Sequence, residues 1–176
     1  MTKKTNQRPD TLVVTAGRDP HANFGMINPP VYHASTILHP TVEILKNKGQ
    51  PYTYGRHGSP TALRDSITAL EGGHNTLLTA SGVAAVTTAL MAHLKSGDHL
   101  LMVDTVYGPT RGFCDKMLPR MGVEVTYYDP HVGAGIAALM QPNTAVVYTE
   151  SPGSNTFEIQ DMPAIAAAAH AGGAIV

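Results

Sequence analysis

Residues Leu77 to Leu94 read LLTASGVAAVTTALMAHL, a short apolar strand pattern followed by a Ser-Gly turn and a helix pattern rich in small side chains. The first N–H groups of a helix lack intrahelical acceptors, and the helix dipole places positive charge beside them. A helix that begins at Ser81-Gly82-Val83 therefore offers a site for an anion, typically a phosphate. A capped turn that binds nothing would have the same pattern, so this segment alone leaves both interpretations open.

Strand and helix patterns alternate over the rest of the chain. We expect strands at 75–79, 99–103, 124–128, 145–149 and 174–176, and helices at 60–71, 82–94, 109–120, 136–140 and 162–170. Residues 1 to about 50 are predicted to be irregular apart from a short helix at 41–48. The alternation predicts an α/β fold with a mainly parallel sheet and helices on both of its faces.

Composition narrows the class of protein. The chain has 176 residues, 43% of them hydrophobic and 14% charged, which is typical of a globular α/β domain. The net charge is −1 and basic residues do not cluster beyond Lys3-Lys4, so neither a nucleic-acid surface nor a membrane surface is indicated. Cys114 is the only cysteine, no signal peptide is recognisable and no apolar run approaches the ~20 residues of a membrane span, which favours a cytoplasmic location.

The carboxyl end of the chain, Gly172-Gly173-Ala174-Ile175-Val176, has the pattern of a buried strand that has just begun. Chain ends usually lie at the surface of a domain. The pattern therefore predicts that the sequence is part of a longer protein.

Three further segments carry side chains that could contact a ligand. Arg56 supplies a planar charged donor two residues after the hydroxyl of Tyr54, and Tyr107 follows an apolar strand at a place where its ring could cover a planar group. The loop at 150–156, which includes Ser154, brings hydroxyl and amide groups to the same expected sheet edge. Each segment also has a plain alternative, since an exposed arginine, a tyrosine that covers the core and a polar loop are all common.

Two other patterns are weaker. Residues 133–138 match the dinucleotide fingerprint G-x-G-x-x-A, but residues 129–132 separate the first glycine from the preceding strand, which argues against a nicotinamide site. The nine histidines do not pair with carboxylates or with the thiol at metal-ligand spacing, so we predict no metal site.

Taken together, the motifs resemble the pyridoxal-phosphate (PLP) enzymes of cysteine and methionine metabolism, which have the aspartate-aminotransferase fold type I. The motifs that carry the resemblance occur in the family's order over about 120 residues: Tyr54-Gly55-Arg56 before Pro60-Thr61, Leu70-Glu71-Gly72-Gly73, Ser81-Gly82-Val83-Ala84-Ala85, Gly97-Asp98-His99, Tyr107 with Thr110, and Glu150-Ser151-Pro152 before Asp161. The resemblance implies an amino-terminal arm at 1–50 that contributes to subunit contacts and, at 51–176, the first part of the large PLP-binding domain, truncated.

The resemblance also implies roles for individual residues. Ser81, Gly82 and Val83 would bind the phosphate of PLP, and Tyr54 and Arg56 would reach the phosphate of the neighbouring subunit in a homo-oligomer, a dimer of dimers. Tyr107 would stack on the cofactor ring and assist proton transfer, which makes it the candidate catalytic residue. Ser154 would belong to the cofactor-binding set, although related enzymes usually carry an Asn-Pro pair at 154–155.

Within the family, segments 111–118, 128–130 and 150–154 look most like those of the bacterial cystathionine β-lyase branch. The implied reaction is the α,β-elimination of cystathionine to homocysteine, pyruvate and ammonia. In the family the lysine that holds PLP, an aspartate at the ring nitrogen and an arginine for the substrate carboxylate come after the last residue here, so we expect the chain alone to be inactive. The alternatives are a γ-lyase or γ-synthase of the same family, a non-catalytic phosphate- or nucleotide-binding domain, and a degenerate subunit that completes a site in a partner.

Overall fold

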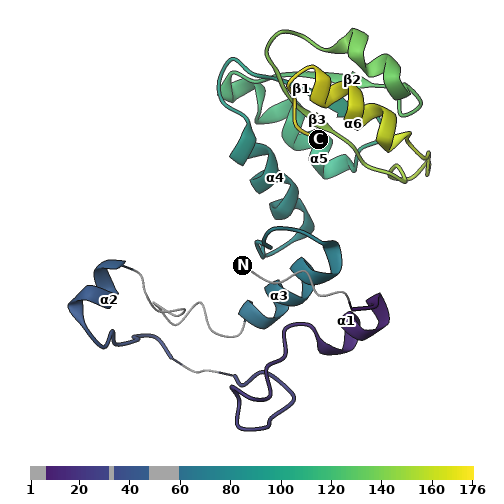
Figure 1. The fold of residues 1–176 in the computed structure, drawn as a ribbon. Coiled ribbons are helices and arrows are strands. Elements are labelled where there is room, and N and C mark those ends of the chain that lie inside the picture. The colour runs from purple at the N-terminus through teal and green to yellow at the C-terminus, as the bar shows by residue number, and fades with distance from the viewer. Residues whose placement is uncertain (1–6, 32–33, 48–59) are drawn as a thin grey trace. The chain divides into compact units, whose positions relative to one another are not determined.

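The computed structural model describes residues 7–31, 34–47 and 60–176. The chain forms two compact units, Met1–Leu78 and Thr79–Val176, and each is described by itself (Figure 1). The first unit holds helices α1 (Pro9–Thr15), α2 (Val42–Asn47) and α3 (Pro60–Glu71). The second holds the sheet and the remaining elements, and it contains the larger part of the candidate site.

Helix α1 differs from the prediction of irregular structure over the first residues of the chain. Its N-cap is Arg8, which makes no capping hydrogen bond, so the usual Ser, Thr, Asp or Asn signal is lacking. Pro9 at the first turn favours the helix, and contact with α3 stabilises it. Ser66 Oγ donates to the Ala16 carbonyl at 2.8 Å, and Gly17 has φ +73° with no room for a Cβ, which would lie 2.2 Å from the Ala62 carbonyl oxygen.

The second unit is built on three parallel strands in the order β2-β1-β3, where β1 is His99–Val103, β2 is Glu124–Tyr128 and β3 is Thr144–Tyr148. Every residue of central strand β1 is buried. Ile175 adds a single parallel bridge to Val146 beyond β3. The expected strands 99–103, 124–128 and 145–149 are thus confirmed within one residue, and the expected strand at 174–176 is reduced to this bridge.

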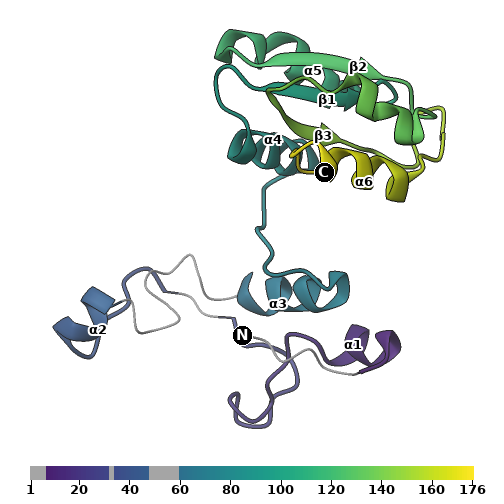
Figure 2. The same cartoon turned by 45° about the horizontal axis from the view of Figure 1, so that its top comes forward.

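Helices cover both faces of the sheet (Figure 2). Helix α5 (Gly108–Lys116) contacts α4 (Gly82–His93), and α6 (Met162–Ala171) contacts the 3₁₀ helix η3 (Gly133–Leu139). Right-handed crossovers from β1 to β2 and from β2 to β3 run in opposite directions along the sheet and therefore place α5 and η3 on opposite faces. The predicted α/β architecture is confirmed.

Three expected elements differ from the structure. Residues 75–79 are extended but form no strand, because they have no hydrogen-bonded partner strand in the described part of the chain; Leu77 is 74% exposed. The expected helix 109–120 ends at Lys116 and is followed by the 3₁₀ helix η2 (Pro119–Met121), since a proline at 119 cannot donate the helical hydrogen bond. Residues 136–140, expected to be helical, belong to 3₁₀ helix η3.

His99 joins the three strands at the amino end of the sheet. The imidazole is fully buried, with Nδ1 2.7 Å from Thr144 Oγ1 and Nε2 2.9 Å from Thr126 Oγ1. Burial lowers the pKa of His99 from its usual value of 6.5, because the interior disfavours the charged form. The neutral ring, with one donor and one acceptor nitrogen, therefore fits between the two hydroxyls.

This burial predicts an acid-sensitive fold. A histidine with a lowered pKa in the folded state binds fewer protons there than in the unfolded state. The free energy of unfolding therefore keeps its whole contribution from His99 above about pH 6.5 and loses it progressively below that pH. We expect the free energy of unfolding to decrease between about pH 7 and pH 5 by an amount that the variant His99→Asn does not show. Urea denaturation of both proteins across this range is the measurement, and parallel pH profiles would contradict the prediction.

Candidate active site

Helix α4 begins with two amide groups that have no acceptor in the described part of the chain, those of Gly82 and Val83. The third, Ala84, donates to Ser81 Oγ at 3.1 Å, so Ser81 is the N-cap of the helix. A Cβ added at Gly82 would meet nothing within 4 Å. Two free donors at the positive end of a 12-residue helix, next to open space, fit a phosphate group.

Helix α4 leads into the central strand of the sheet. Helix α4 packs against β3, and the chain turns through residues 94–98 into β1, so α4 runs opposite to that strand (Figure 2). The loops that carry Tyr107 and Ser154 leave the sheet at its carboxyl edge, after β1 and β3.

Tyr107 and Ser154 are brought together by Glu150. One carboxylate oxygen of Glu150 accepts the backbone N–H of Tyr107 at 3.2 Å, and the other accepts the hydroxyl of Ser154. The Ser154 N–H also donates to the Thr105 carbonyl at 2.9 Å. Tyr107 is the N-cap of α5 and is half exposed, which leaves its ring accessible from solvent.

A buried polar network anchors Glu150 to the core. The side-chain amide of Gln160 donates to the Glu150 carbonyl at 2.7 Å, and its backbone N–H donates to Ser151 Oγ at 3.0 Å. The Tyr128 hydroxyl lies 3.0 Å from Gln160 Oε1 and 2.9 Å from the Tyr148 carbonyl, both acceptors. Burial raises the pKa of Tyr128, so this hydroxyl stays protonated and acts as a donor.

Sequence reasoning assigned no role to Glu150, Gln160 or Tyr128. The motif Glu150-Ser151-Pro152 does not by itself identify Glu150 as the side chain that joins the two loops. Gln160 is 4% exposed although it is polar, and nothing in the sequence near it, between Ile159 and Asp161, signals burial. A buried polar residue of this kind can be assigned a role only when its hydrogen-bond partners are known from the structure.

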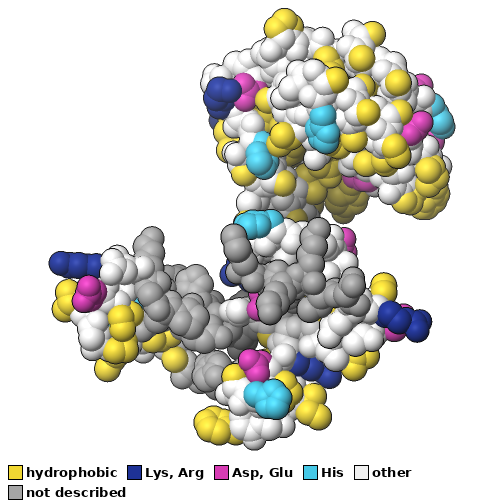
Figure 3. Space-filling model, viewed as in Figure 1, with side chains coloured by type: hydrophobic (Ala, Val, Ile, Leu, Met, Phe, Trp, Pro, Cys, Tyr) yellow, Lys and Arg dark blue, Asp and Glu magenta, His cyan; other side chains and the backbone are white. Residues whose placement is uncertain are grey.

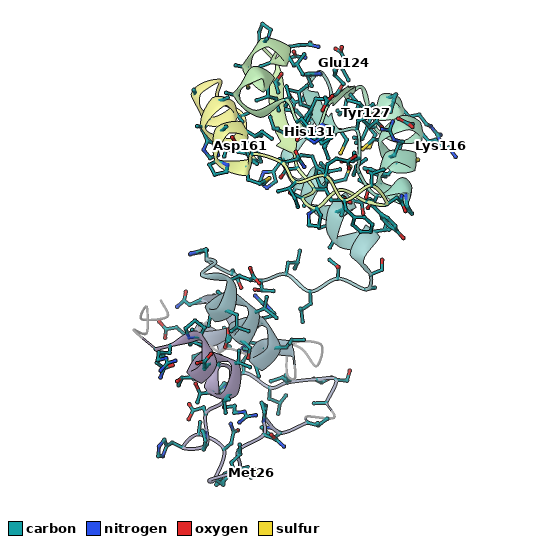
Figure 4. The ribbon with its side chains drawn as sticks, turned by 90° about the vertical axis from the view of Figure 1, so that its right-hand side faces the viewer. Met26, Lys116, Glu124, Tyr127, His131 and Asp161 are labelled. Carbon is teal, nitrogen blue, oxygen red and sulfur yellow. The ribbon has the colours of Figure 1, made fainter. Side chains whose placement is uncertain are left out.

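A second cluster joins α5 to β2 and to the residue that follows β1. The guanidinium of Arg111 pairs with Asp104 and stacks on the Tyr127 ring, 3.8 Å from its centroid. The Tyr127 hydroxyl donates to Asp115, so Tyr127 points toward α5, the helix that carries Lys116 (Figure 4). Because its charge is already paired and stacked, we assign Arg111 to holding α5 against β2.

Other reactive groups do not add to the site. Cys114 is fully buried, and burial raises the pKa of its thiol to about 11, so it is protonated and inert at neutral pH. Among the described residues, no three histidine, cysteine or carboxylate side chains lie close enough to hold a metal ion, and no helix is long and apolar enough to cross a bilayer. Charged side chains are scattered over the visible face of the second unit rather than gathered by sign (Figure 3).

The remaining predicted site residues, Tyr54 and Arg56, lie outside the described residues. Of the site residues predicted from the sequence, the structure therefore places five in two groups within the second unit. Ser81, Gly82 and Val83 form the helix start, and Tyr107 and Ser154 are joined through Glu150. Their contacts with a cofactor stay predictions.

An α/β unit that carries a helix start with two unpaired amides and a loop with an exposed tyrosine is typical of cofactor-binding proteins. Residues 10–176 match the family model described as Cys/Met metabolism PLP-dependent enzyme. The chain belongs to this family, and pyridoxal phosphate is the family's cofactor.

Individual relatives agree with this assignment. The chain is 54% identical over 169 residues to a putative cystathionine β-lyase of Rhizobium johnstonii, covering 95% of this chain and 43% of the relative. It is 40% identical over 167 residues to cystathionine β-lyase MetC of Escherichia coli, covering 90% and 42%. A crystal structure of cystathionine γ-lyase from Lactobacillus plantarum, complexed with L-serine, superposes with a TM-score of 0.85 at 30% identity, covering 96% of this chain and 43% of that one. The chain thus spans less than half the length of the curated relatives that it matches.

Proposed function

We propose that the chain is the amino-terminal part of a PLP-dependent carbon–sulfur lyase that cleaves cystathionine by α,β-elimination. The observation that carries the proposal is the pair of unpaired amides at Gly82 and Val83, in the unit that also holds Tyr107. Membership of the PLP family supports phosphate as their ligand. The high identity to relatives named cystathionine β-lyase supports the choice of reaction.

Each residue of the site would have a distinct task. The amides of Gly82 and Val83 bind the 5′-phosphate, and the Ser81 cap keeps the third amide occupied so that the helix start is rigid. The Tyr107 ring covers the pyridine ring and its hydroxyl takes part in proton transfer. When bound, PLP supplies an electron sink that lets the Cα proton leave and the Cβ–S bond of the substrate break.

Tyr54 and Arg56 complete the proposal through oligomer formation. A guanidinium binds a phosphate in a forked, charge-assisted geometry, and a phenol adds one further donor. In the proposed homo-oligomer these two side chains reach the phosphate of the neighbouring subunit, with residues 1–50 as an arm at the subunit contact. Location in the cytoplasm is part of the proposal, because a chain with one cysteine forms no intrachain disulfide.

The products formed from cystathionine test the reaction. We expect the whole protein with PLP to release pyruvate and homocysteine, since β-elimination breaks the bond on the cysteine side of the sulfur. Pyruvate and 2-oxobutyrate are separated by chromatography of the keto acids. Release of 2-oxobutyrate would favour the second candidate, a γ-lyase, which the similarity to the Lactobacillus plantarum structure supports. A protein that binds phosphate but develops no PLP absorbance would contradict both.

A further inference from the structure

We infer that Glu150 is a positioning residue for the Tyr107 ring, acting through the Tyr107 backbone and not on the substrate. The inference rests on the proposed function, because Tyr107 is there assigned to the cofactor ring. Glu150 stands just after β3, and Tyr107 stands between β1 and α5. The single carboxylate thus joins two loops that leave neighbouring strands.

The contact controls the direction in which Tyr107 leaves the backbone. Tyr107 precedes the first residue of α5, and its side chain makes no capping hydrogen bond. Its N–H points outside the helix and is held by Glu150 Oε2 at 3.2 Å. A hydrogen bond that fixes the backbone of Tyr107 also fixes the position of its Cβ and the direction of its side chain. Loss of this bond would therefore let the half-exposed ring change its position.

Glu150 itself is well fixed. Its backbone carbonyl accepts from Gln160, a residue buried against Tyr128, and its second carboxylate oxygen accepts from Ser154. Because a hydroxyl has one proton, Ser154 donates to Glu150 and presents its oxygen outward as an acceptor. Glu150 is thus fixed at its backbone carbonyl and at its carboxylate, and it can hold the Tyr107 loop in one position.

The number of acceptors explains why a glutamate suits this position. Two donors, an amide and a hydroxyl, converge on one side chain, and a carboxylate accepts from both at once. A glutamine retains the reach, with its oxygen toward Tyr107 and its NH₂ toward Ser154. An aspartate retains the charge but is one methylene shorter and cannot span both loops.

Four variants of the whole protein, each loaded with PLP, distinguish the effect of the side-chain length at position 150 from the effect of its charge. We expect Glu150→Ala and Glu150→Asp to lose most of the visible circular dichroism of the bound cofactor, to weaken PLP affinity about tenfold and to lower kcat by about 10–100-fold. Glu150→Gln should retain these properties within about threefold of wild type. Glu124→Ala is the matched control, since Glu124 accepts from Gln141 at the opposite, amino end of the sheet, at the start of β2 (Figure 4).

A double-mutant cycle with Tyr107→Ala tests the route of action. If Glu150 acts through Tyr107, Glu150→Ala has little further effect on cofactor dichroism or kcat once the ring is removed. Additive effects would overturn the inference, as would wild-type dichroism in Glu150→Ala or a loss in Glu150→Gln that Glu150→Asp does not share. Absence of PLP binding by the wild-type protein would instead overturn the proposed function. If Glu150→Ala does not fold, the Asp and Gln pair still decides.

Discussion

Replacement of Gly82 by proline is expected to weaken PLP binding by the whole protein about 10–100-fold while leaving the helix intact. Proline removes the backbone N–H, and a hydrogen bond to a charged group contributes about 1.5–3 kcal/mol. Gly82 is the first helical residue, where proline is well tolerated because the N–H has no intrahelical acceptor. Ser81 has φ −160° and ψ 165°, an extended conformation that a following proline favours.

The matched control is Gly82→Ala, which keeps the N–H and adds a methyl group where nothing lies within 4 Å. We expect its PLP affinity to be close to that of wild type. Titration of the apoprotein with PLP, followed by absorbance, gives the affinities, and thermal unfolding checks that both variants fold. If the proline and alanine variants bound PLP equally well, the Gly82 amide would not be a phosphate ligand.

Replacement of Gly153 by alanine is expected to disrupt the junction of the two site loops and to cost about 1–3 kcal/mol of stability. A Cβ at this position would lie 2.6 Å from Thr105 Oγ1 and 2.8 Å from Thr105 Cβ. Thr105 cannot simply withdraw, because its carbonyl accepts the backbone N–H of Ser154. The overlap therefore pushes apart the loops that carry Tyr107 and Ser154, and PLP affinity should fall together with stability.

Gly108→Ala provides the comparison, since it makes the same substitution in the neighbouring loop. Gly108 is the first residue of α5, and an added Cβ there meets nothing within 4 Å. Alanine favours the helix over glycine, so stability should be unchanged or slightly higher. Urea denaturation and PLP titration of the two variants provide the measurements. Equal stability of Gly153→Ala and Gly108→Ala would show that the loops have room to adjust.

The sheet was predictable because its strands have a strong local signal. A continuous apolar run such as LLMV in β1 indicates a strand covered on both faces, and the structure buries all five residues of that strand. The segment 75–79 has a similar apolar pattern but forms no strand in the described structure. A strand is defined by hydrogen bonds to a neighbour, and composition does not tell which neighbour is available.

Part of the site was equally accessible from local sequence. The sequence predicts a helix start open to an anion, because Ser81 is a suitable N-cap, Gly82 has no Cβ and small residues follow. The structure has a helix that begins there. Helix α1 was missed for the opposite reason. Its stability comes from contact with α3 and from the close approach at Gly17, which are tertiary effects without a capping signal.

By itself, then, the amino-acid order determined the parallel α/β architecture and the donor-rich beginning of α4, because helix caps, strand hydrophobicity and glycine positions act over a few neighbouring residues. Tertiary structure alone decided that Glu150 joins Tyr107 to Ser154 and that Gln160 and Tyr128 hold it in place. These partners lie up to 43 residues apart in the chain. Hydrogen bonds over such separations form only after the sheet has aligned the ends of its strands, so no local pattern specifies them.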